Sequence, residues 1–300
     1  MHWKLAAFGL LSLHASFALA NYEQGTQELQ SKNYASALYE FRQSAETGNP
    51  DAQYRLATMY QQGIGTPQKA DKATKWYRLA ADSGHPAAQV QLANQYLQDD
   101  DDDDAARWYK RAANQGETAA QFRLGLMYLE GRGVEQDDAQ AAKWLGKAAE
   151  QGITAAQNNL GSLYEDGRGV EQDNAMAVKW YRQAAEGGDA YAQNSLGAMY
   201  AQGKGVDQNH AWATFWFALA AAQGNEVAAK NIASSQKHLQ TATISVGTAN
   251  IRAGSSTDYD IVTKAHRGDT LRILGSNSGW SQVYLPGLQQ LGWVASRLLE

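Results

Sequence analysis

The sequence repeats one pattern of residues at a nearly constant period. An Ala-Gln pair, or Ala-Ala in the last copy, opens each block at spacings of 36, 32, 36, 36 and 36 residues. The opening residues are Ala52, Ala88, Ala120, Ala156, Ala192 and Ala228. A leucine or isoleucine follows four residues later, and in five copies a tyrosine comes four after that, which places these side chains on one stripe of a helix. A period of this length predicts a stack of similar units that share one continuous core.

The second half of each block has its own pattern. A glycine-punctuated turn comes first, spelled GRGV at 131–134 and again at 167–170. A second stripe then runs through Trp76, Trp108, Trp144, Trp180 and Trp216, each followed by an Ala-Ala pair and a closing glycine. Glycines in these places suit a chain reversal and a helix C-cap. Each block is therefore predicted to be two antiparallel helices that bury their apolar stripes against the neighbouring blocks.

Both ends of the array have weaker spelling. Residues 21–50 are predicted to form a capping helical hairpin, in which Glu40 stands where the other blocks have tryptophan. Residues 51–240 are predicted to form the solenoid proper, with five repeats and a C-terminal cap helix. Polar replacements of this kind are expected on terminal units that face solvent.

The pattern AQxxLGxxYxxGxGV, followed by Trp and AAxxG, resembles the Sel-1-like repeat family, which is related to the tetratricopeptide arrays. The resemblance implies an α-solenoid that serves as a protein-binding scaffold, often in bacterial envelopes. Some members of that family bridge each hairpin with a disulfide. This chain has no cysteine, so packing alone must hold the stack.

The first twenty residues have the order of a cleavable secretory signal. His2 and Lys4 precede an apolar stretch that ends with Ala18-Leu19-Ala20. We expect cleavage after Ala20 and a periplasmic or secreted chain without a membrane span; the alternative is an uncleaved anchor. Without a cysteine the chain has no thiol for a lipid anchor.

The texture changes after about Gln240, where helical periodicity gives way to short β-branched runs separated by turn signals. Residues 241–300 resemble the bacterial Src-homology-3-like (SH3b) family, from the Asn250-Ile251-Arg252 start to the Gly279-Trp280 and Gly292-Trp293 pairs. This resemblance implies a small all-β barrel that binds envelope polymers or peptides such as peptidoglycan. We expect a chain truncated near Gln240 to stay helical and soluble, with no core shared between the two parts. The predicted fold class is an all-α solenoid of stacked antiparallel helix pairs followed by a small all-β SH3-like barrel.

Charge and composition bound the partners. The formal net charge is −5, and residues 241–300 carry five Lys and Arg against four acids, so the acidic excess lies in the solenoid. An acidic stack speaks against nucleic acid or anionic lipid as partners. We expect a monomer that binds a protein or peptide.

No residue pattern indicates catalysis, a cofactor or a metal. The histidines beyond residue 20 are His85, His210, His238 and His266, and they lack the spacing of metal ligands. Serines such as Ser162 and Ser195 lie in repeat helices instead of a GxSxG elbow. We therefore predict a protein that is not an enzyme.

Six aspartates at 99–104 occupy the block that is four residues short. Alternating carboxylates can bind calcium, but a calcium loop also needs a glycine and a distal glutamate, and neither follows here. The run is interpreted as a shortened, solvated connection whose last aspartates favour the next helix N-terminus, with calcium binding as the alternative.

Two sets of residues are candidate binding residues. The first, which we name the polar column, lies three residues after each opening alanine and comprises Arg55, Gln91, Arg123, Asn159, Ser195 and Asn231. In related solenoids this helix lines the concave face, and these side chains can donate hydrogen bonds to peptide carbonyls or a terminal carboxylate. The alternative is that they bond the neighbouring turn. The second set, in the barrel, is Arg252, Tyr259, Trp280 and Trp293, for which the alternative is a place in the barrel core.

Together these features predict a non-enzymatic adaptor whose solenoid holds a protein partner and whose barrel docks on cell-wall peptide or an envelope protein. A second possibility is an inhibitor or immunity-type regulator of an envelope enzyme such as a peptidoglycan hydrolase. A third is an enzyme with a site that no motif reveals.

Overall fold

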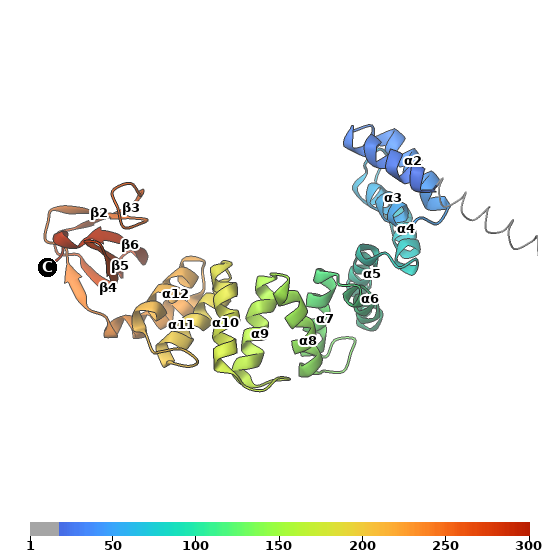
Figure 1. Ribbon diagram of the computed structural model, residues 1–300. Helices are drawn as coiled ribbons and strands as arrows, with labels where there is room; N and C mark the ends of the chain where they lie inside the picture. Colours follow the sequence, from blue (N-terminus) through green and yellow to red (C-terminus); the bar gives the residue numbers. More distant parts are fainter. Residues whose placement is uncertain (1–17) are drawn as a thin grey trace, which may run out of the picture. The chain divides into compact units, whose positions relative to one another are not determined.

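A computed structural model describes residues 18–300 (Figure 1). A helix over residues 18–30 comes first, and regular helices then follow one another up to Ser235. They are α2 (Tyr34–Glu46), α3 (Pro50–Gln62), α4 (Ala70–Asp82), α5 (Pro86–Gln98), α6 (Asp102–Asn114), α7 (Thr118–Glu130), α8 (Asp138–Glu150), α9 (Thr154–Asp166), α10 (Asn174–Glu186), α11 (Ala190–Gln202), α12 (His210–Ala222) and α13 (Glu226–Ser235). Strands follow, so the predicted fold class is confirmed.

The chain forms two compact units that divide between Lys147 and Ala148, within α8. In each unit, the first helix of a block packs against the second helix that follows it, as α3 packs on α4 and α11 on α12. The second helix also packs on the first helix of the next block, as α4 does on α5 and α10 on α11. The blocks thus stack through both of their helices, as the repeat predicts.

The predicted stripes form the core. Leu56, Leu92, Leu124 and Leu196 are fully buried, and so are the paired alanines that follow the tryptophans, except for the half-buried Ala221. The closing glycines have φ values of 88° to 94°, which confirms their predicted role at the helix ends. These small residues allow the helices to approach closely.

The second glycine of each GxG turn has an additional role. A Cβ atom at Gly133 would overlap the carbonyl oxygen of Asp102 at the start of α6, and one at Gly205 would overlap that of Asn174 at the start of α10. The turn therefore packs directly on the N-terminus of the preceding second helix. Glycine is required here for close approach as well as for its positive φ.

In five blocks a buried glutamine ties the first helix to the preceding second helix, whereas α13 has Ala229 in its place. The glutamine of the Ala-Gln pair donates from Nε2 to a backbone carbonyl eight residues earlier, at 3.1 to 3.3 Å. The pairs are Gln53–Ala45, Gln89–Ala81, Gln121–Ala113, Gln157–Ala149 and Gln193–Ala185, and we name these glutamines the glutamine column. Since an unpaired buried carbonyl costs about 1–3 kcal/mol, each of these bonds stabilises the packing of a second helix on the next first helix.

The aspartates of the short block lie at the start of α6. Asp101 is the N-cap of α6 and accepts a hydrogen bond from the backbone N–H of Asp104, and Asp102 to Asp104 fill the first turn. Asp102 also accepts two hydrogen bonds from Arg132, at 2.8 and 3.1 Å. The run is thus a helix start whose charges complement the helix dipole, as predicted.

The C-terminal part is a six-stranded antiparallel sheet in the order β1-β4-β5-β6-β2-β3. Its strands are β1 (Thr241–Thr243), β2 (Thr248–Arg252), β3 (Ile261–His266), β4 (Thr270–Asn277), β5 (Trp280–Leu285) and β6 (Gln290–Ala295). Alternate residues point inward, so Ile251, Leu271, Val283 and Val294 are fully buried in one cluster. Register shifts at Ile251/Arg252 in β2 and at Ile273/Gly275 in β4 mark bulges in the strands next to the two edges of the sheet.

The barrel and the last repeat share an apolar cluster. Tyr284 of β5, which is 2% exposed, lies in one cluster with Ala213, Phe217 and Ala218 of α12. Leu274 and Leu291 pack against the same cluster. The expectation that the two parts share no core is therefore wrong, because apolar side chains on the outer face of the barrel cover α12.

The predicted signal sequence falls almost entirely on residues 1–17, which lie outside the described residues. Ala18 belongs to the first helix, and its carbonyl accepts a hydrogen bond from the Ser44 hydroxyl at 2.6 Å. Cleavage after Ala20 stays a prediction. From residue 18 onward, no helix is both long enough and apolar enough to cross a membrane.

Candidate functional site

The polar column lies on the first helices of the blocks. Arg55 and Arg123 are exposed on α3 and α7, and the other four members are half-buried on α5, α9, α11 and α13. Asn159 donates to Ala155 O in its own helix at 2.8 Å, and Asn231 donates to Asn194 Oδ1 of α11 at 3.0 Å. The glutamine column, two positions earlier, bonds carbonyls near the ends of the second helices. The binding role of the polar column stays a prediction.

Buried tyrosines on the second helices donate hydrogen bonds to side chains of the same first helices. Tyr77, Tyr109 and Tyr181 each follow a tryptophan of the second stripe, and their rings are buried. The Tyr77 hydroxyl donates to Gln61 Oε1 at 2.7 Å, and the Tyr109 hydroxyl donates to Asn94 Oδ1. Burial raises the pKa of both phenols. The repeated Trp-Tyr dipeptide is the sequence signal that could have identified these hydroxyls.

In the second unit the tyrosine centres a polar cluster. Tyr181 OH donates to Glu165 Oε2 at 2.9 Å, and the hydroxyls of Ser162 and of Ser195 in the polar column also interact with the phenol. Burial and the Glu165 charge raise the pKa of Tyr181 strongly, so the phenol stays protonated. Lys204 Nζ lies 3.9 Å from Glu165 Oε1. The cluster joins α9, α10 and α11 and presents both charges and hydroxyls near the surface of the first helices.

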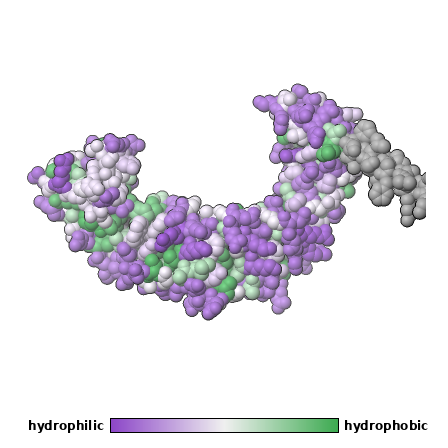
Figure 2. Space-filling model, in the orientation of Figure 1, coloured by the Kyte–Doolittle hydropathy of each residue, from purple (hydrophilic) through white to green (hydrophobic). Residues whose placement is uncertain are grey.

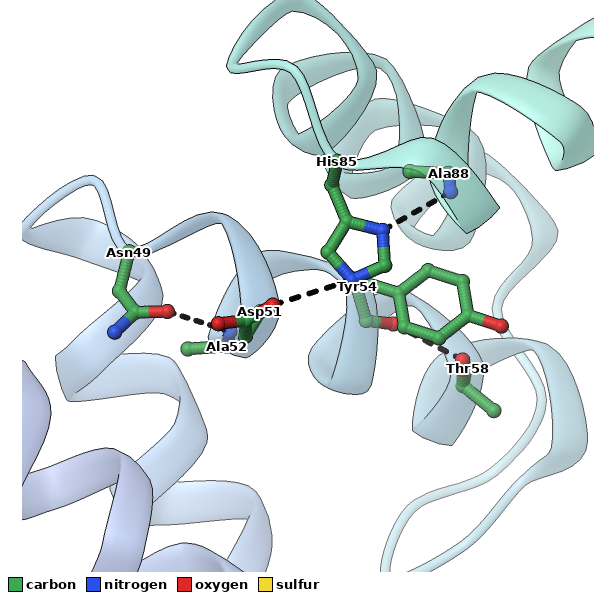
Figure 3. A network of polar contacts seen from close by, with 7 residues as sticks. All are labelled: Asn49, Asp51, Ala52, Tyr54, Thr58, His85 and Ala88. Atoms are coloured by element: carbon green, nitrogen blue, oxygen red, sulfur yellow. Dashed lines mark hydrogen bonds and ion pairs between the residues drawn. The ribbon is translucent and has the colours of Figure 1, made fainter. Parts of the chain in front are cut away.

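His85 performs a structural role (Figure 3). Its Nδ1 accepts a hydrogen bond from Ala88 N at 3.2 Å and caps α5, and its ring stacks on Tyr54 with centroids 4.4 Å apart. Nε2 lies 3.4 Å from Asp51 Oδ1. Burial lowers the pKa of His85 and outweighs the opposing effect of Asp51, so the imidazole is neutral and Nε2–H faces the carboxylate.

The four barrel candidates separate into different places. Arg252 Nη1 donates to Tyr259 O at 2.7 Å and closes the loop after β2, where the Tyr259 ring is 53% exposed. Trp293 pairs with Arg252 and with Gln282 in the sheet register, and Trp280 is half-buried at the start of β5. The structure therefore brings Arg252, Tyr259 and Trp293 into one neighbourhood and places Trp280 in the pair with Ala295.

Trp293 also lines a cavity between α12 and the barrel. This cavity has a volume of about 250 Å³ and is walled by Trp212 and Phe215 of α12 and by Leu274 and Gln282 of the sheet. Trp212 is 47% exposed and meets Phe215 edge-on, with ring centroids 5.5 Å apart. Figure 2 shows hydrophobic surface where the barrel adjoins the last repeat, whereas hydrophilic surface dominates the earlier repeats. Sequence analysis missed Trp212 and Phe215, because a helix without its neighbour does not reveal a shared wall.

Metal and nucleophile chemistry find no support in the part of the chain that is described. No group of three or more His, Cys, Asp or Glu side chains from residue 18 onward is arranged to hold a metal ion. The polar groups described above form hydrogen bonds within the described part of the chain, and none of these bonds joins a nucleophile to a base.

The geometry defines a class of protein, an α-solenoid of helix pairs that carries a small β-barrel on its last repeat. The Sel1 repeat model matches residues 13–49, 50–85, 86–117, 118–153, 154–189 and 190–225, and the bacterial SH3 domain model matches residues 247–300. The chain belongs to the Sel1 repeat family and ends in a bacterial SH3 domain, as the sequence resemblances implied. Sel1 repeat scaffolds are generally non-catalytic and mediate protein interactions, and bacterial SH3 domains bind the cell wall.

Solved structures agree with this assignment. A protective antigen of uropathogenic Escherichia coli is 35% identical with a TM-score of 0.65, over 76% of this chain and 51% of that one. A Sel1 repeat protein from Oxalobacter formigenes is 30% identical with a TM-score of 0.64, over 72% of this chain and 90% of that one.

Curated relatives match over short segments only. YrvJ of Bacillus subtilis, named as a candidate N-acetylmuramoyl-L-alanine amidase, is 42% identical over 59 residues, which are 20% of this chain and 11% of YrvJ. Serine/threonine-protein kinase D of Synechocystis is 39% identical over 59 residues, 18% of this chain and 12% of the kinase. The chain thus spans only a small part of the curated relatives it matches.

Proposed function

We propose that this chain is a non-enzymatic scaffold of the bacterial cell envelope, periplasmic or secreted. Its polar column binds a protein partner, and its barrel docks on cell-wall peptide or on an envelope protein. The observation that carries the proposal is the division of labour on the first helices. The glutamine column bonds carbonyls near the ends of the second helices from buried positions, whereas the polar column is exposed at Arg55 and Arg123 and half-buried at its other members.

The chemistry of the polar column suits a peptide or an acidic protein surface. The guanidinium groups of Arg55 and Arg123 are exposed and present planar, multiple donors that match carboxylates and carbonyls. In the second unit, Ser195 adds a hydroxyl near the Tyr181 phenol and the Glu165 carboxylate, so this part of the polar column offers both donors and acceptors. Such a surface recognises extended backbone better than it recognises an apolar helix.

The barrel supports the envelope part of the proposal. Bacterial SH3 domains bind the cell wall, and one relative that shares a 59-residue segment is named as a candidate N-acetylmuramoyl-L-alanine amidase. In the proposed scaffold, wall binding positions the solenoid and its partner.

Two measurements test the proposal. The full chain should pellet with purified wall sacculi, and it should capture a partner from envelope extract that mass spectrometry identifies and titration then verifies. Changing both Arg123 and Asn159 to Ala should weaken that complex by about thirty- to a thousand-fold, since two hydrogen bonds, one charge-assisted, are lost. The matched control changes Lys110 and Gln183, exposed on second helices, to Ala and should leave binding intact.

Other outcomes distinguish the alternatives. A chain that ignores sacculi and forms a stoichiometric complex with one wall hydrolase is an inhibitor of that enzyme. An unfolding midpoint lowered by the Arg123 and Asn159 changes, with unaltered affinity of the folded fraction, would show that these residues are structural and end the role of the polar column.

A further inference from the structure

A second cavity lies on the barrel, and none of the candidate binding residues Arg252, Tyr259, Trp280 and Trp293 lines it. It has a volume of about 620 Å³ and is formed by β3, the start of β4 and the turn between β5 and β6. Lys264, His266, Asp269 and Arg272 contribute its charged and titratable groups, and Pro286 and Leu288 form its apolar wall. We name it the basic cavity.

The pleat of the two strands explains why these side chains converge. Ala265 in β3 and Leu271 in β4 are fully buried in the barrel core. Their neighbours Lys264, His266 and Arg272 therefore point to the outer face of the sheet, because successive side chains alternate. The short turn that joins β3 to β4 keeps these residues close, although the two strands are not neighbours in the sheet. In that turn Asp269 Oδ2 accepts a hydrogen bond from His266 N at 2.7 Å.

Lys264 and Arg272 bring two positive charges to the basic cavity, and the Asp269 carboxylate offsets one of them. Neither Lys264 nor Arg272 forms an ion pair with any residue from 18 onward. The Nε atom of Arg272 is buried and has no hydrogen-bond partner among the described residues. A buried donor of a charged group without an acceptor is costly, and an anion in the cavity would supply the acceptor.

The strand beside the cavity favours a peptide over a small anion. β3 is a terminal strand of the sheet, so one side of its backbone faces no other strand. Ile261 and Val262 on it are 45% and 39% exposed, and Leu288 across the cavity is 53% exposed. An extended chain can add to such an edge through backbone hydrogen bonds and place its apolar side chains on these residues.

We propose that the basic cavity binds a peptide that ends in a free carboxylate, which Arg272 and Lys264 hold while the peptide backbone lies along β3. The proposal deepens the proposed docking of the barrel on cell-wall peptide and rests on it. It assigns the recognition of that peptide to residues other than Arg252, Tyr259, Trp280 and Trp293.

The test uses the full chain and two synthetic probes, N-acetyl-tetra-alanine with a free C-terminal carboxylate and the same peptide as its C-terminal amide. Binding is followed by NMR of the arginine Nε–H groups. The acid should shift the Arg272 Nε–H resonance, and the amide should bind at least about tenfold more weakly, because it loses a charge-assisted pair. Lys264→Gln, an exposed change that leaves the core intact, should weaken the acid by about tenfold, and so should Arg272→Gln. Arg297→Gln, exposed on the same barrel, is the matched control and should change nothing.

Equal binding of the acid and the amide would overturn the proposal, and so would an effect of Arg297→Gln as large as that of Lys264→Gln. If inorganic phosphate shifts Arg272 and the peptide acid does not, the cavity binds phosphate groups and the peptide assignment is wrong. Sedimentation with sacculi separates this result from the broader function. A chain that fails the peptide test but still pellets with sacculi docks on the wall elsewhere, whereas failure of both removes wall docking as well.

Discussion

The solenoid and the barrel differ in how often each position occurs. In the solenoid every position is repeated along the chain, so that structural and surface roles fall into separate columns. Gln193 and Ser195 lie two residues apart on α11, yet Gln193 is buried and donates to the Ala185 carbonyl, whereas Ser195 is half-buried near Tyr181. In the barrel each position occurs once, and an aromatic residue such as Trp293 can only be assigned when its neighbours are known. Repetition thus allows buried and surface positions to be distinguished from the sequence.

The two regions also differ in the size of the side chains that hold them together. Pairs of fully buried alanines and single large rings fill the solenoid. The barrel is joined to the last repeat by Tyr284, a large side chain inserted among the small residues of α12. Four experiments test the roles assigned to these side chains.

The largest effect is expected in the solenoid core. Trp144 is 3% exposed and packs among alanines of three helices, so Trp144→Ala should lower the free energy of unfolding by about 3–5 kcal/mol. Trp212→Ala is the matched control, since Trp212 is 47% exposed, and should cost about 1 kcal/mol or less. Denaturant unfolding followed by helical circular dichroism measures both. Equal losses would mean that burial does not separate the two tryptophans.

Tyr284 tests the link between the regions. Tyr284→Ala should cost about 3 kcal/mol, because a buried aromatic ring is lost from a cluster that small residues cannot refill. The loss should appear both in the indole N–H resonances of Trp280 and Trp293, which report on the barrel, and in the helical circular dichroism signal. A change confined to the barrel signal would show that the shared cluster does not couple the two parts, and a chain ending at Gln240 would then be stable as the sequence suggested.

The two columns on α11 should respond differently. Gln193→Ala leaves the Ala185 carbonyl buried without its donor and should cost about 1–3 kcal/mol. Ser195→Ala should stay within about 0.5 kcal/mol, since Tyr181 keeps its bond to Glu165. Thermal unfolding of the two variants side by side decides whether the polar column is free of structural duty. A larger loss for Ser195→Ala would reverse the assignment.

The smallest expected effect concerns the His85 cap. Its pKa is lowered in the folded chain, so the unfolded chain binds the proton more readily and stability falls as the pH drops below the ordinary histidine value of about 6.5. Protonation of Nδ1 also removes the cap of α5, worth about 1 kcal/mol. Asparagine caps α3 and α13 in the same place, so His85→Asn should keep the stability at high pH and lose this part of the pH dependence. Identical pH profiles for the two chains would exclude His85 as a titrating cap.

The sequence predicted the helix pairs, their order and most of their core, because the interactions that define them are local and repeated. Four-residue steps such as Leu56 to Tyr60 and glycines at fixed places constrain each helix without knowledge of its neighbours. The resemblance of residues 241–300 to a barrel family was equally sufficient for the fold class. It did not decide what Trp280 or Trp293 touch.

By itself, then, the sequence determined the architecture: a period of 36 residues with alternating stripes admits few ways to bury its apolar side chains. Tertiary structure alone decided the surfaces. The glutamine column bonds the carbonyls near the helix ends, and Tyr284 packs the barrel against α12. Lys264 and Arg272 line the same cavity. Periodicity specifies which face of an element is buried, whereas a binding surface depends on which side chains from distant elements meet, and no local pattern records that.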